Sequence, residues 1–286
     1  MQAAVPGGAD LKMGYEPCVV VVGVGLIGGS IAAAVRAVWP SASVIGIGRN
    51  ADRLRAAQQM GLITGWTDSI SAEVIPAGSL GVVCLPVDRI AGTARALLRA
   101  GCGAVTDAGS TKREICRQLE SEPLFVGAHP IAGSEQAGFE HADEGLFRGR
   151  VCVICAGGAD LGAVARVEHF WRSLGLSLQR LSAADHDRIL ALTSHLPHVL
   201  AAVAAGVVED EQLVFAGSGF RDTTRIAAGS AEVWTSILLE NAEACVQAIC
   251  RAEELLGRFR RALEQRDGEL LQRLWNVSAE RRRKLN

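Results

Sequence analysis

The sequence predicts an α/β fold, in which a doubly wound, mostly parallel sheet is followed by an all-helical domain. Apolar, strand-like runs alternate with helical segments from Cys18 to about residue 182, and this alternation is typical of βαβ units. After Ser182 the strand-like runs stop, and most of the remaining chain has the spacing of helices. We therefore expect a first domain over 18–182 and a second over 183–286, with residues 1–17 as a flexible leader.

The first βα turn carries a dinucleotide-binding fingerprint. Four consecutive valines at 19–22 predict a strand buried on both faces, and the alanines after Ser30 predict a helix. The glycines between them have the G-x-G-x-x-G spacing, which allows a tight turn, close approach to a pyrophosphate and close helix packing. The helix N-terminus would add unpaired N–H groups for that pyrophosphate. A Rossmann-type domain is predicted, with cofactor-binding residues Gly23, Gly25, Leu26, Ile27 and Gly28.

The end of the second predicted strand, 43–48, bears on the choice of cofactor. NAD-binding chains usually place Asp or Glu about 20 residues after the last fingerprint glycine, where it binds the ribose hydroxyls. Here that position is Gly48, followed by Arg49 and Asn50. Arg49, together with Arg53, could pair with a 2′-phosphate. NADP is therefore favoured over NAD, with Gly48, Arg49, Asn50 and Arg53 as contacts.

A second interpretation of the same residues involves no ligand. Arg49 could simply be exposed, while Asn50 or Asp52 caps a helix over 53–60 that Gly61 ends.

Composition excludes several classes of protein. The 286-residue chain has 29 basic and 31 acidic residues, so no basic surface for nucleic acid or membranes is predicted. Its eight cysteines lie mostly in apolar segments, as in reduced cytoplasmic proteins. Cys152 and Cys155 form a C-x-x-C pair, but in a strand they would point to opposite faces, and no second pair follows. No metal site is expected, and the N-terminus lacks the pattern of a signal peptide.

Two further strand ends should lie beside the cofactor, because carboxyl ends of parallel strands form the ligand crevice. One is Leu85–Pro86, and the other is the strand 104–107, which opens into Ser110 and Lys112. The predicted crevice residues are Leu85, Pro86, Asp107 and Ser110. A structural alternative is that Thr111 and Glu114 form a capping box for the next helix.

His129 follows a predicted strand at 124–127 and is held by Pro130 among small residues that extend to Gly133. An imidazole has an ordinary pKa near 6.5, which suits a general base. Its position past a strand end favours proton chemistry, although a structural histidine is the alternative.

The second domain begins with a long predicted helix from Asp185 to about Val208, which Pro197 interrupts. A proline inside a helix costs about 3 kcal/mol or more and frees a backbone carbonyl. The kink would present His195 and His198 on one face. They could form a substrate wall, pack in a core or, less favourably, bind a metal.

Arg225 and Asp222 are three residues apart, so they could pair on a helix surface for about 0.2–0.5 kcal/mol. Arg225 could instead bind a substrate carboxylate in a bidentate fashion. The later segments, at 232–257, 259–266 and from Gly268 on, are expected to be apolar helices that form a homodimer interface.

Taken together, these motifs resemble the prephenate/arogenate dehydrogenase family of tyrosine biosynthesis. The resemblance covers about residues 18–280, and its motifs occur in order. They are the glycine turn, 106–112 (TDAGSTK), 127–135 (GAHPIAGSE), 194–198 (SHLPH) and 220–227 (FRDTTRIA), with Trp234 beyond.

The resemblance implies oxidative decarboxylation of prephenate or arogenate, with hydride transfer to NADP or NAD and no metal. It implies that His129 deprotonates the ring hydroxyl, that Ser110 contacts this hydroxyl or the nicotinamide, and that Arg225 and His195 bind substrate carboxylates. It further implies substrate contacts from His198, Ser134, Glu135 and Asp222, of which the two acidic residues could gate the pocket. Gly133 completes the expected cofactor set.

Two other functions remain open from the residues alone. A β-hydroxyacid or imine-type reductase shares this domain plan but usually relies on a helix-borne lysine, and the second domain here has only Lys284. A non-catalytic NADP-sensing protein would bind cofactor without turnover.

Overall fold

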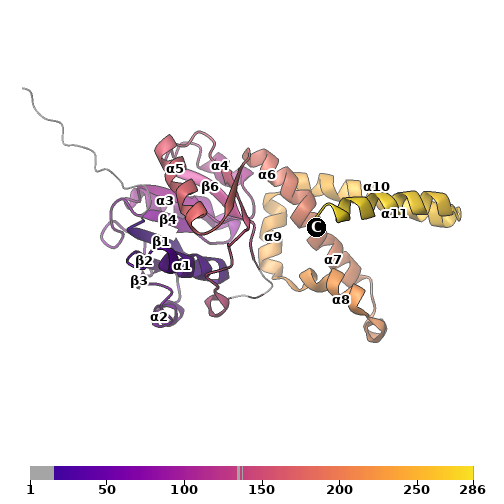
Figure 1. The fold of residues 1–286 in the computed structure, drawn as a ribbon, viewed down its shortest axis with the longest axis horizontal. Helices are drawn as coiled ribbons and strands as arrows, with labels where there is room; N and C mark the ends of the chain where they lie inside the picture. Colours follow the sequence, from indigo (N-terminus) through magenta and orange to yellow (C-terminus); the bar gives the residue numbers. More distant parts are fainter. Residues whose placement is uncertain (1–15, 134–135, 137, 286) are drawn as a thin grey trace, which may run out of the picture. The chain divides into compact units, whose positions relative to one another are not determined.

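The structure is a computed structural model that describes residues 16–133, 136 and 138–285. Its first part is built on one eight-stranded sheet in the order β3-β2-β1-β4-β5-β6-β7-β8 (Figure 1). All neighbours are parallel except β6 and β7, so the predicted doubly wound, mostly parallel sheet is confirmed. The strands are β1 Cys18–Val22, β2 Ser43–Ile47, β3 Gly65–Thr67, β4 Leu80–Val83, β5 Ala104–Asp107, β6 Phe125–Pro130, β7 Val151–Cys155 and β8 Ser177–Arg180.

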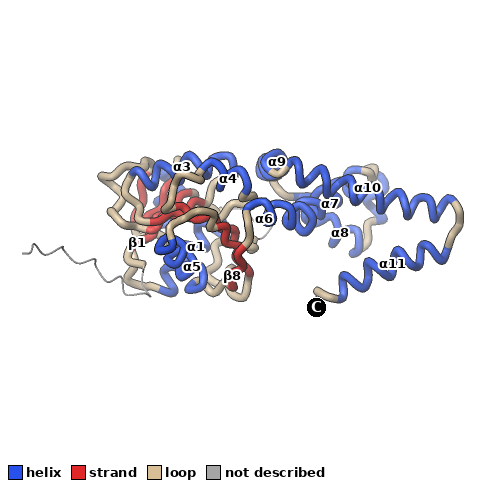
Figure 2. The backbone as a smooth tube through the Cα atoms, turned by 90° about the horizontal axis from the view of Figure 1, so that it is seen from above, coloured by secondary structure: helices blue, strands red, loops and turns tan. Residues whose placement is uncertain are grey.

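Both faces of the sheet are covered by helices, as Figure 2 shows. The valines of β1 alternate between the two resulting cores, with Val19 and Val21 in one and Val20 and Val22 in the other. The first core takes side chains from α1 and α5, and the second from α3 and α4. The bounds are α1 Leu26–Val38, α2 Ala51–Gln59, α3 Val87–Arg99, α4 Arg113–Gln118 and α5 Leu161–Ser173, with a 3-10 turn η1 at Phe139–His141.

The predicted leader is corrected at its last two residues, while the remainder lies outside the described chain. Glu16 is buried, and its carboxylate accepts two hydrogen bonds from the Arg166 guanidinium, at 2.9 and 2.8 Å. Pro17 accepts a hydrogen bond from the backbone N–H of Ser43. Both residues therefore belong to the packed structure of the sheet.

After β8 the described chain is helical, as predicted. The elements are α6 Ala183–Leu190, a π-helical segment η2 Ala191–His195, α7 Leu196–Gly206, η3 Asp210–Phe215, α8 Ser218–Thr224, η4 Arg225–Ala228, α9 Ala231–Glu240, α10 Ala242–Glu264 and α11 Gly268–Arg283. The expected single helix over 232–257 is interrupted at Asn241, and α10 continues past Gly257, where a break was expected.

The chain forms two compact units whose division differs from the predicted boundary near 182. One unit holds the chain up to Asp187 together with residues 228–240, and the other holds residues 188–227 and the chain from Asn241. Helix α9 groups with the sheet because it packs on α3, where the Ser236 hydroxyl lies 3.4 Å from an Asp88 carboxylate oxygen. We call these parts the sheet unit and the helical unit.

One helical stretch in the described chain, Ala183–Gly206, has the length and apolar composition that a membrane span would need. It comprises α6, η2 and α7, and it carries the two histidines His195 and His198.

Candidate active site

The glycine turn after β1 has the geometry that a dinucleotide requires. Gly23 has a φ of 92°, and a Cβ there would lie 2.3 Å from the Cys84 carbonyl oxygen. A Cβ on Gly28 would lie 2.1 Å from the Gly23 carbonyl oxygen, so α1 can pack closely only with glycine. By contrast, a Cβ on Gly25 would meet nothing within 4 Å. Gly25 is the N-cap of α1 and has no side chain to cover the N–H groups there, which leaves room for a pyrophosphate.

A surface pocket adjoins the carboxyl end of β2. Arg53 extends along it, with its guanidinium 5.2 Å from the centre of the Phe139 ring and 3.6 Å from a Glu140 carboxylate oxygen. Asp52 turns aside and pairs with Arg55 at 2.7 Å. The pocket is lined by Val24, Gly48, Arg49, Asn50, Arg53 and Leu54, a set that contains two guanidinium groups and no carboxylate.

Asn50 is also a helix cap, because its side-chain oxygen accepts a hydrogen bond from the Arg53 N–H at 3.0 Å. The capping interpretation is confirmed, with α2 running from Ala51 to Gln59 and Gly61 beyond it at a φ of 76°. Capping fixes the position of Asn50 without using Arg49, whose side chain is exposed.

The carboxylate of Asp107, at the end of β5, points into the protein. It is fully buried and forms an ion pair with the equally buried Lys112. It also accepts hydrogen bonds from Gly109 N at 2.9 Å and from Ala128 N at 3.0 Å. Asp107 therefore ties together β5, the loop that carries Ser110, and β6 next to His129.

The predicted capping box of Thr111 and Glu114 is wrong. Helix α4 begins at Arg113, and the Glu114 carboxylate bonds to the Arg117 and Gln118 side chains instead. The cap comes from a distant part of the chain: Asp187 accepts hydrogen bonds from Lys112 N at 2.7 Å and Arg113 N at 2.9 Å. A carboxylate from α6 thus takes the place that the local sequence pattern had offered to Thr111.

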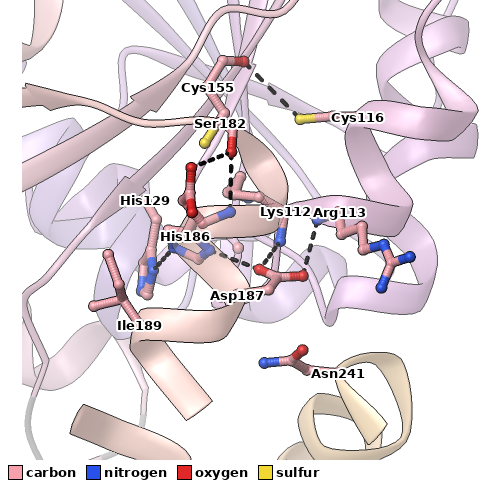
Figure 3. A network of polar contacts seen from close by, with 12 residues as sticks. Lys112, Arg113, Cys116, His129, Cys155, Ser182, His186, Asp187, Ile189 and Asn241 are labelled. Carbon is pink, nitrogen blue, oxygen red and sulfur yellow. Dashed lines mark hydrogen bonds and ion pairs between the residues drawn. The ribbon is translucent and has the colours of Figure 1, made fainter. Parts of the chain in front are cut away.

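His129 stands at the carboxyl end of β6, where its half-buried ring meets His186 (Figure 3). The Nδ1 atom of His129 lies 2.8 Å from His186 Nε2, and His186 Nδ1 lies 2.7 Å from an Asp187 carboxylate oxygen. Burial lowers the pKa of His186 below its ordinary value, although the hydrogen bond with Asp187 opposes the shift. Burial alone would raise the pKa of Asp187, but the hydrogen bonds from His186, Arg113 and Lys112 bring it below its ordinary value.

The predicted residues of the sheet unit gather at one edge of the sheet. Parallel strands β1, β4, β5 and β6 all end there. The residues brought to this edge are Gly23, Gly25, Leu26, Ile27, Gly28, Leu85, Pro86, Asp107, Ser110 and His129, with Gly133 in the segment after β6. The predicted Ser134 and Glu135 lie outside the described residues.

In the helical unit, the predicted kink at Pro197 takes the form of a π-helical turn that ends at His195. The imidazole of His198 donates a hydrogen bond from Nδ1 to the Ser194 carbonyl at 2.9 Å, which satisfies a carbonyl in the turn that Pro197 disrupts. Burial lowers the pKa of His198, and the nearby positive charge of Arg225 acts in the same direction. Arg225 is the first residue of η4, and Asp222 lies three residues before it. Both side chains are exposed.

His195 is almost fully buried. It contacts Asn241, the residue before α10, and Cys245 in α10. Its Nδ1 atom lies 3.2 Å from the Asn241 amide nitrogen and 3.5 Å from the Cys245 sulfur. The amide nitrogen of Asn241 can only donate, so Nδ1 accepts from it and the ring hydrogen resides on Nε2. His195 is thereby a hydrogen-bond donor through Nε2.

The described chain holds no cluster of metal-binding side chains and no accessible thiolate at Cys152 or Cys155. Among its residues, no group of three or more His, Cys, Asp or Glu side chains could hold a metal ion. Burial raises the pKa of Cys155 to about 12, and Cys152 is buried as well, so neither thiol is an accessible thiolate at neutral pH.

Sequence reasoning missed His186, which contacts the imidazole of His129, and Asp187, which contacts His186. The only signal available was their position directly after the last strand, in the first turn of a helix that Ser182 opens. Nothing local indicates that this turn meets β6 and α4.

Comparisons with known proteins agree along most of the chain. Residues 31–179 match the family model of the prephenate dehydrogenase nucleotide-binding domain, and residues 182–276 match that of the prephenate dehydrogenase dimerization domain. Prephenate dehydrogenase of Bacillus subtilis is 30% identical over 278 residues, covering 92% of this chain and 75% of the relative. Cyclohexadienyl dehydrogenase of Zymomonas mobilis is 29% identical over 266 residues, covering 88% and 90%.

Solved structures give the same result. Prephenate dehydrogenase of Aquifex aeolicus, crystallised with hydroxyphenyl propionate and NAD+, superposes with a TM-score of 0.86 at 29% identity, covering 94% of this chain and 98% of that one. Arogenate dehydrogenase of Synechocystis has a TM-score of 0.78 at 26% identity, with 94% and 100% covered. The chain therefore belongs to the prephenate dehydrogenase family, the NAD(P)-dependent prephenate/arogenate dehydrogenases of tyrosine biosynthesis.

Proposed function

We propose that this enzyme uses NADP to decarboxylate prephenate oxidatively, with arogenate as the alternative substrate and His129 as the general base. The observation that carries the proposal is the position of His129 at the carboxyl end of β6, on the sheet edge where the glycine turn and Ser110 also lie. In a doubly wound sheet this edge forms the ligand crevice.

When bound, the oxidised nicotinamide supplies the hydride acceptor, and the glycine turn at Gly23, Gly25 and Gly28 would hold its pyrophosphate. His129 takes the proton of the ring hydroxyl, so that a carbonyl forms as the hydride leaves the same carbon. The ring carboxylate then leaves as carbon dioxide, and its bonding electrons pass through the ring to the carbonyl oxygen, which takes the proton back from His129 as the ring becomes aromatic. Ser110, in the loop that Asp107 and Lys112 anchor, is the proposed contact to the same hydroxyl.

For the substrate carboxylates we propose Arg225 and His195. Arg225 offers a planar fork of donors, and His195 carries its ring hydrogen on Nε2, because Nδ1 accepts from the Asn241 amide nitrogen. His198, Ser134, Glu135 and Asp222 remain proposed substrate contacts on the strength of the family motifs. Arg225→Ala should raise the substrate KM with little change in cofactor affinity, and an unchanged KM would leave only a surface role for this arginine.

The preference for NADP is supported by the pocket at the end of β2. Arg49 and Arg53 line it, while the carboxylate of Asp52 is engaged by Arg55. A 2′-phosphate would gain charge-assisted hydrogen bonds there, whereas an NAD-type site would usually offer a carboxylate to the ribose.

We also propose a homodimer formed through the helical unit, in the reducing environment of the cytoplasm. An apolar hollow between α10 and α11 is lined by Phe259, Leu263, Leu271, Gln272, Trp275 and Asn276. Leu263 is 63% exposed and Trp275 is 71% exposed, more apolar surface than a monomer usually leaves in water. The cysteines of the described chain are all free thiols.

Steady-state rates with prephenate and arogenate, each against NAD and NADP, test the reaction and both preferences. His129→Ala should lower turnover about 10²–10⁴-fold while cofactor affinity stays nearly unchanged. The exposed His141 provides a matched control, whose replacement by Ala should leave turnover as it is. Cofactor binding without turnover on either substrate would contradict the proposal and favour an NADP-sensing protein.

A further inference from the structure

We infer that His186 and Asp187 are positioning residues, which hold the His129 imidazole in the tautomer with its hydrogen on Nδ1 and its lone pair on Nε2. This inference rests on the proposed role of His129 as base. It concerns residues that lie outside the ordered family motifs and that touch His129 rather than the substrate. The contacts that carry it run in one line from His129 through His186 to Asp187 (Figure 3).

The direction of each hydrogen bond follows from the far end of this line. Asp187 is an ionised carboxylate whose oxygens accept from the backbone N–H groups of Lys112 and Arg113. An ionised carboxylate can only accept, so the hydrogen between Asp187 and His186 belongs to His186 Nδ1. A neutral His186 then has its lone pair on Nε2, and His129 Nδ1 must supply the hydrogen to it.

Burial keeps His186 neutral, and a neutral His186 fixes the direction of both of its hydrogen bonds. Its side chain is fully buried, and its pKa is lowered chiefly by desolvation. The charged groups facing it are Asp187, Asp107 and Lys112, of which the lysine opposes a positive imidazole and the two carboxylates favour it. The Cys152 thiol, near the His129 backbone, has a strongly raised pKa through burial and stays neutral.

The same contacts prepare His129 for the proton that it receives. Protonation on Nε2 leaves Nδ1–H in place, so no ring rotation or hydrogen-bond exchange is needed during the reaction. The positive charge that then forms is stabilised by the His186 acceptor, with the Asp187 carboxylate behind it. Without His186, the His129 ring would be free to carry its hydrogen on Nε2, where it could not accept a proton.

A pair of variants at His186 separates this role from packing. His186→Gln offers a carbonyl oxygen to His129 Nδ1–H and an amide N–H to Asp187, so it can reproduce both hydrogen bonds. His186→Phe fills similar volume and makes neither. Circular dichroism and thermal unfolding of the full-length protein verify that each variant folds, and cofactor titration verifies that the glycine turn is intact.

The direct readout is the 15N spectrum of histidine-labelled protein without substrate or cofactor, with the His129 signals assigned by their loss in His129→Gln. Above pH 8 the wild type and His186→Gln should show the Nδ1–H tautomer at His129, and His186→Phe should show a mixture or the Nε2–H form. In activity, His186→Phe should lower kcat/KM about 10–100-fold, toward the loss of general base catalysis, and move its acid limb to lower pH. His186→Gln should recover most of both.

An Nε2–H tautomer at His129 in the wild type would overturn the inference, and so would an unchanged tautomer and pH profile in His186→Phe. Failure of the proposed function looks different, because turnover would then survive His129→Ala while the spectra still report the tautomer. If His186→Phe does not fold, His186→Asn, which is too short to span both hydrogen bonds, provides the same two measurements.

Discussion

Replacing Lys112 by Met should cost the sheet unit about 3–5 kcal/mol, because it removes one member of a buried ion pair. Lys112 and Asp107 are both fully buried in the folded protein. Met has a similar length and fills most of the same space, so a cavity contributes little to the loss. The loss comes instead from the Asp107 carboxylate, which would keep only the N–H groups of Gly109 and Ala128 as partners.

This magnitude is a large part of the 5–15 kcal/mol that stabilises a typical domain. Urea unfolding, followed by circular dichroism and tryptophan fluorescence, measures it as a lower midpoint at an unchanged slope. Lys284→Met serves as the control, since its exposed side chain should contribute less than about 0.5 kcal/mol. The double variant Lys112→Met with Asp107→Asn removes both charges and should recover more than half of the loss.

The double-mutant cycle decides whether the reasoning holds. A coupling energy of several kcal/mol between the two positions is expected, since each single change leaves a buried charge without its partner and the double change does not. A loss below about 1 kcal/mol for Lys112→Met, or a coupling near zero, would show that water or a rearranged loop compensates Asp107. The ion pair would then not be the anchor of the Ser110 loop.

Three further predictions concern pH and the cofactor. Because His186 and Asp187 have pKa values below those of the unfolded chain, their contribution is full above the unfolded values of 6.5 and 3.8 and is lost as pH falls. Urea titrations should therefore show the free energy of unfolding declining from about pH 6.5 downward, and a flat profile between pH 7 and 5 would refute this. Gly25→Val should weaken cofactor binding at least tenfold and lower the Tm less than Gly28→Ala does, because a Cβ at Gly25 meets nothing within 4 Å, as thermal melts and fluorescence titrations can compare. Arg49→Ala should reduce the preference for NADP over NAD, measured as the ratio of kcat/KM values, and a wild type that already prefers NAD would contradict the charge argument.

The sequence predicted those parts of the fold that local patterns determine. The four valines of β1 indicate a strand buried on both faces, and the structure places alternate valines in the two cores. Asn50 was predicted as a cap from its position before a helix, and it caps α2. In such cases, a few neighbouring residues contain all the information that the structure uses.

The error at the start of α4 has a different origin, since it depends on a partner far away in the chain. Thr111 and Glu114 fit a capping box, but Asp187 reaches the same N–H groups from α6. Spacing along the chain does not report which of two suitable partners lies closer in the folded protein.

The two buried carboxylates support the candidate base from opposite sides, which links stability to catalysis at this site. Asp107 accepts from the N–H of Ala128 and so fixes the strand position next to His129. Asp187 acts through His186 on the ring of His129, while it also caps α4. Substitutions at either carboxylate should therefore lower the Tm and kcat together, because one set of contacts holds both the fold and the ring. Substitutions at Ser110 should lower kcat alone, because its partly exposed side chain is carried by the loop and does not hold it.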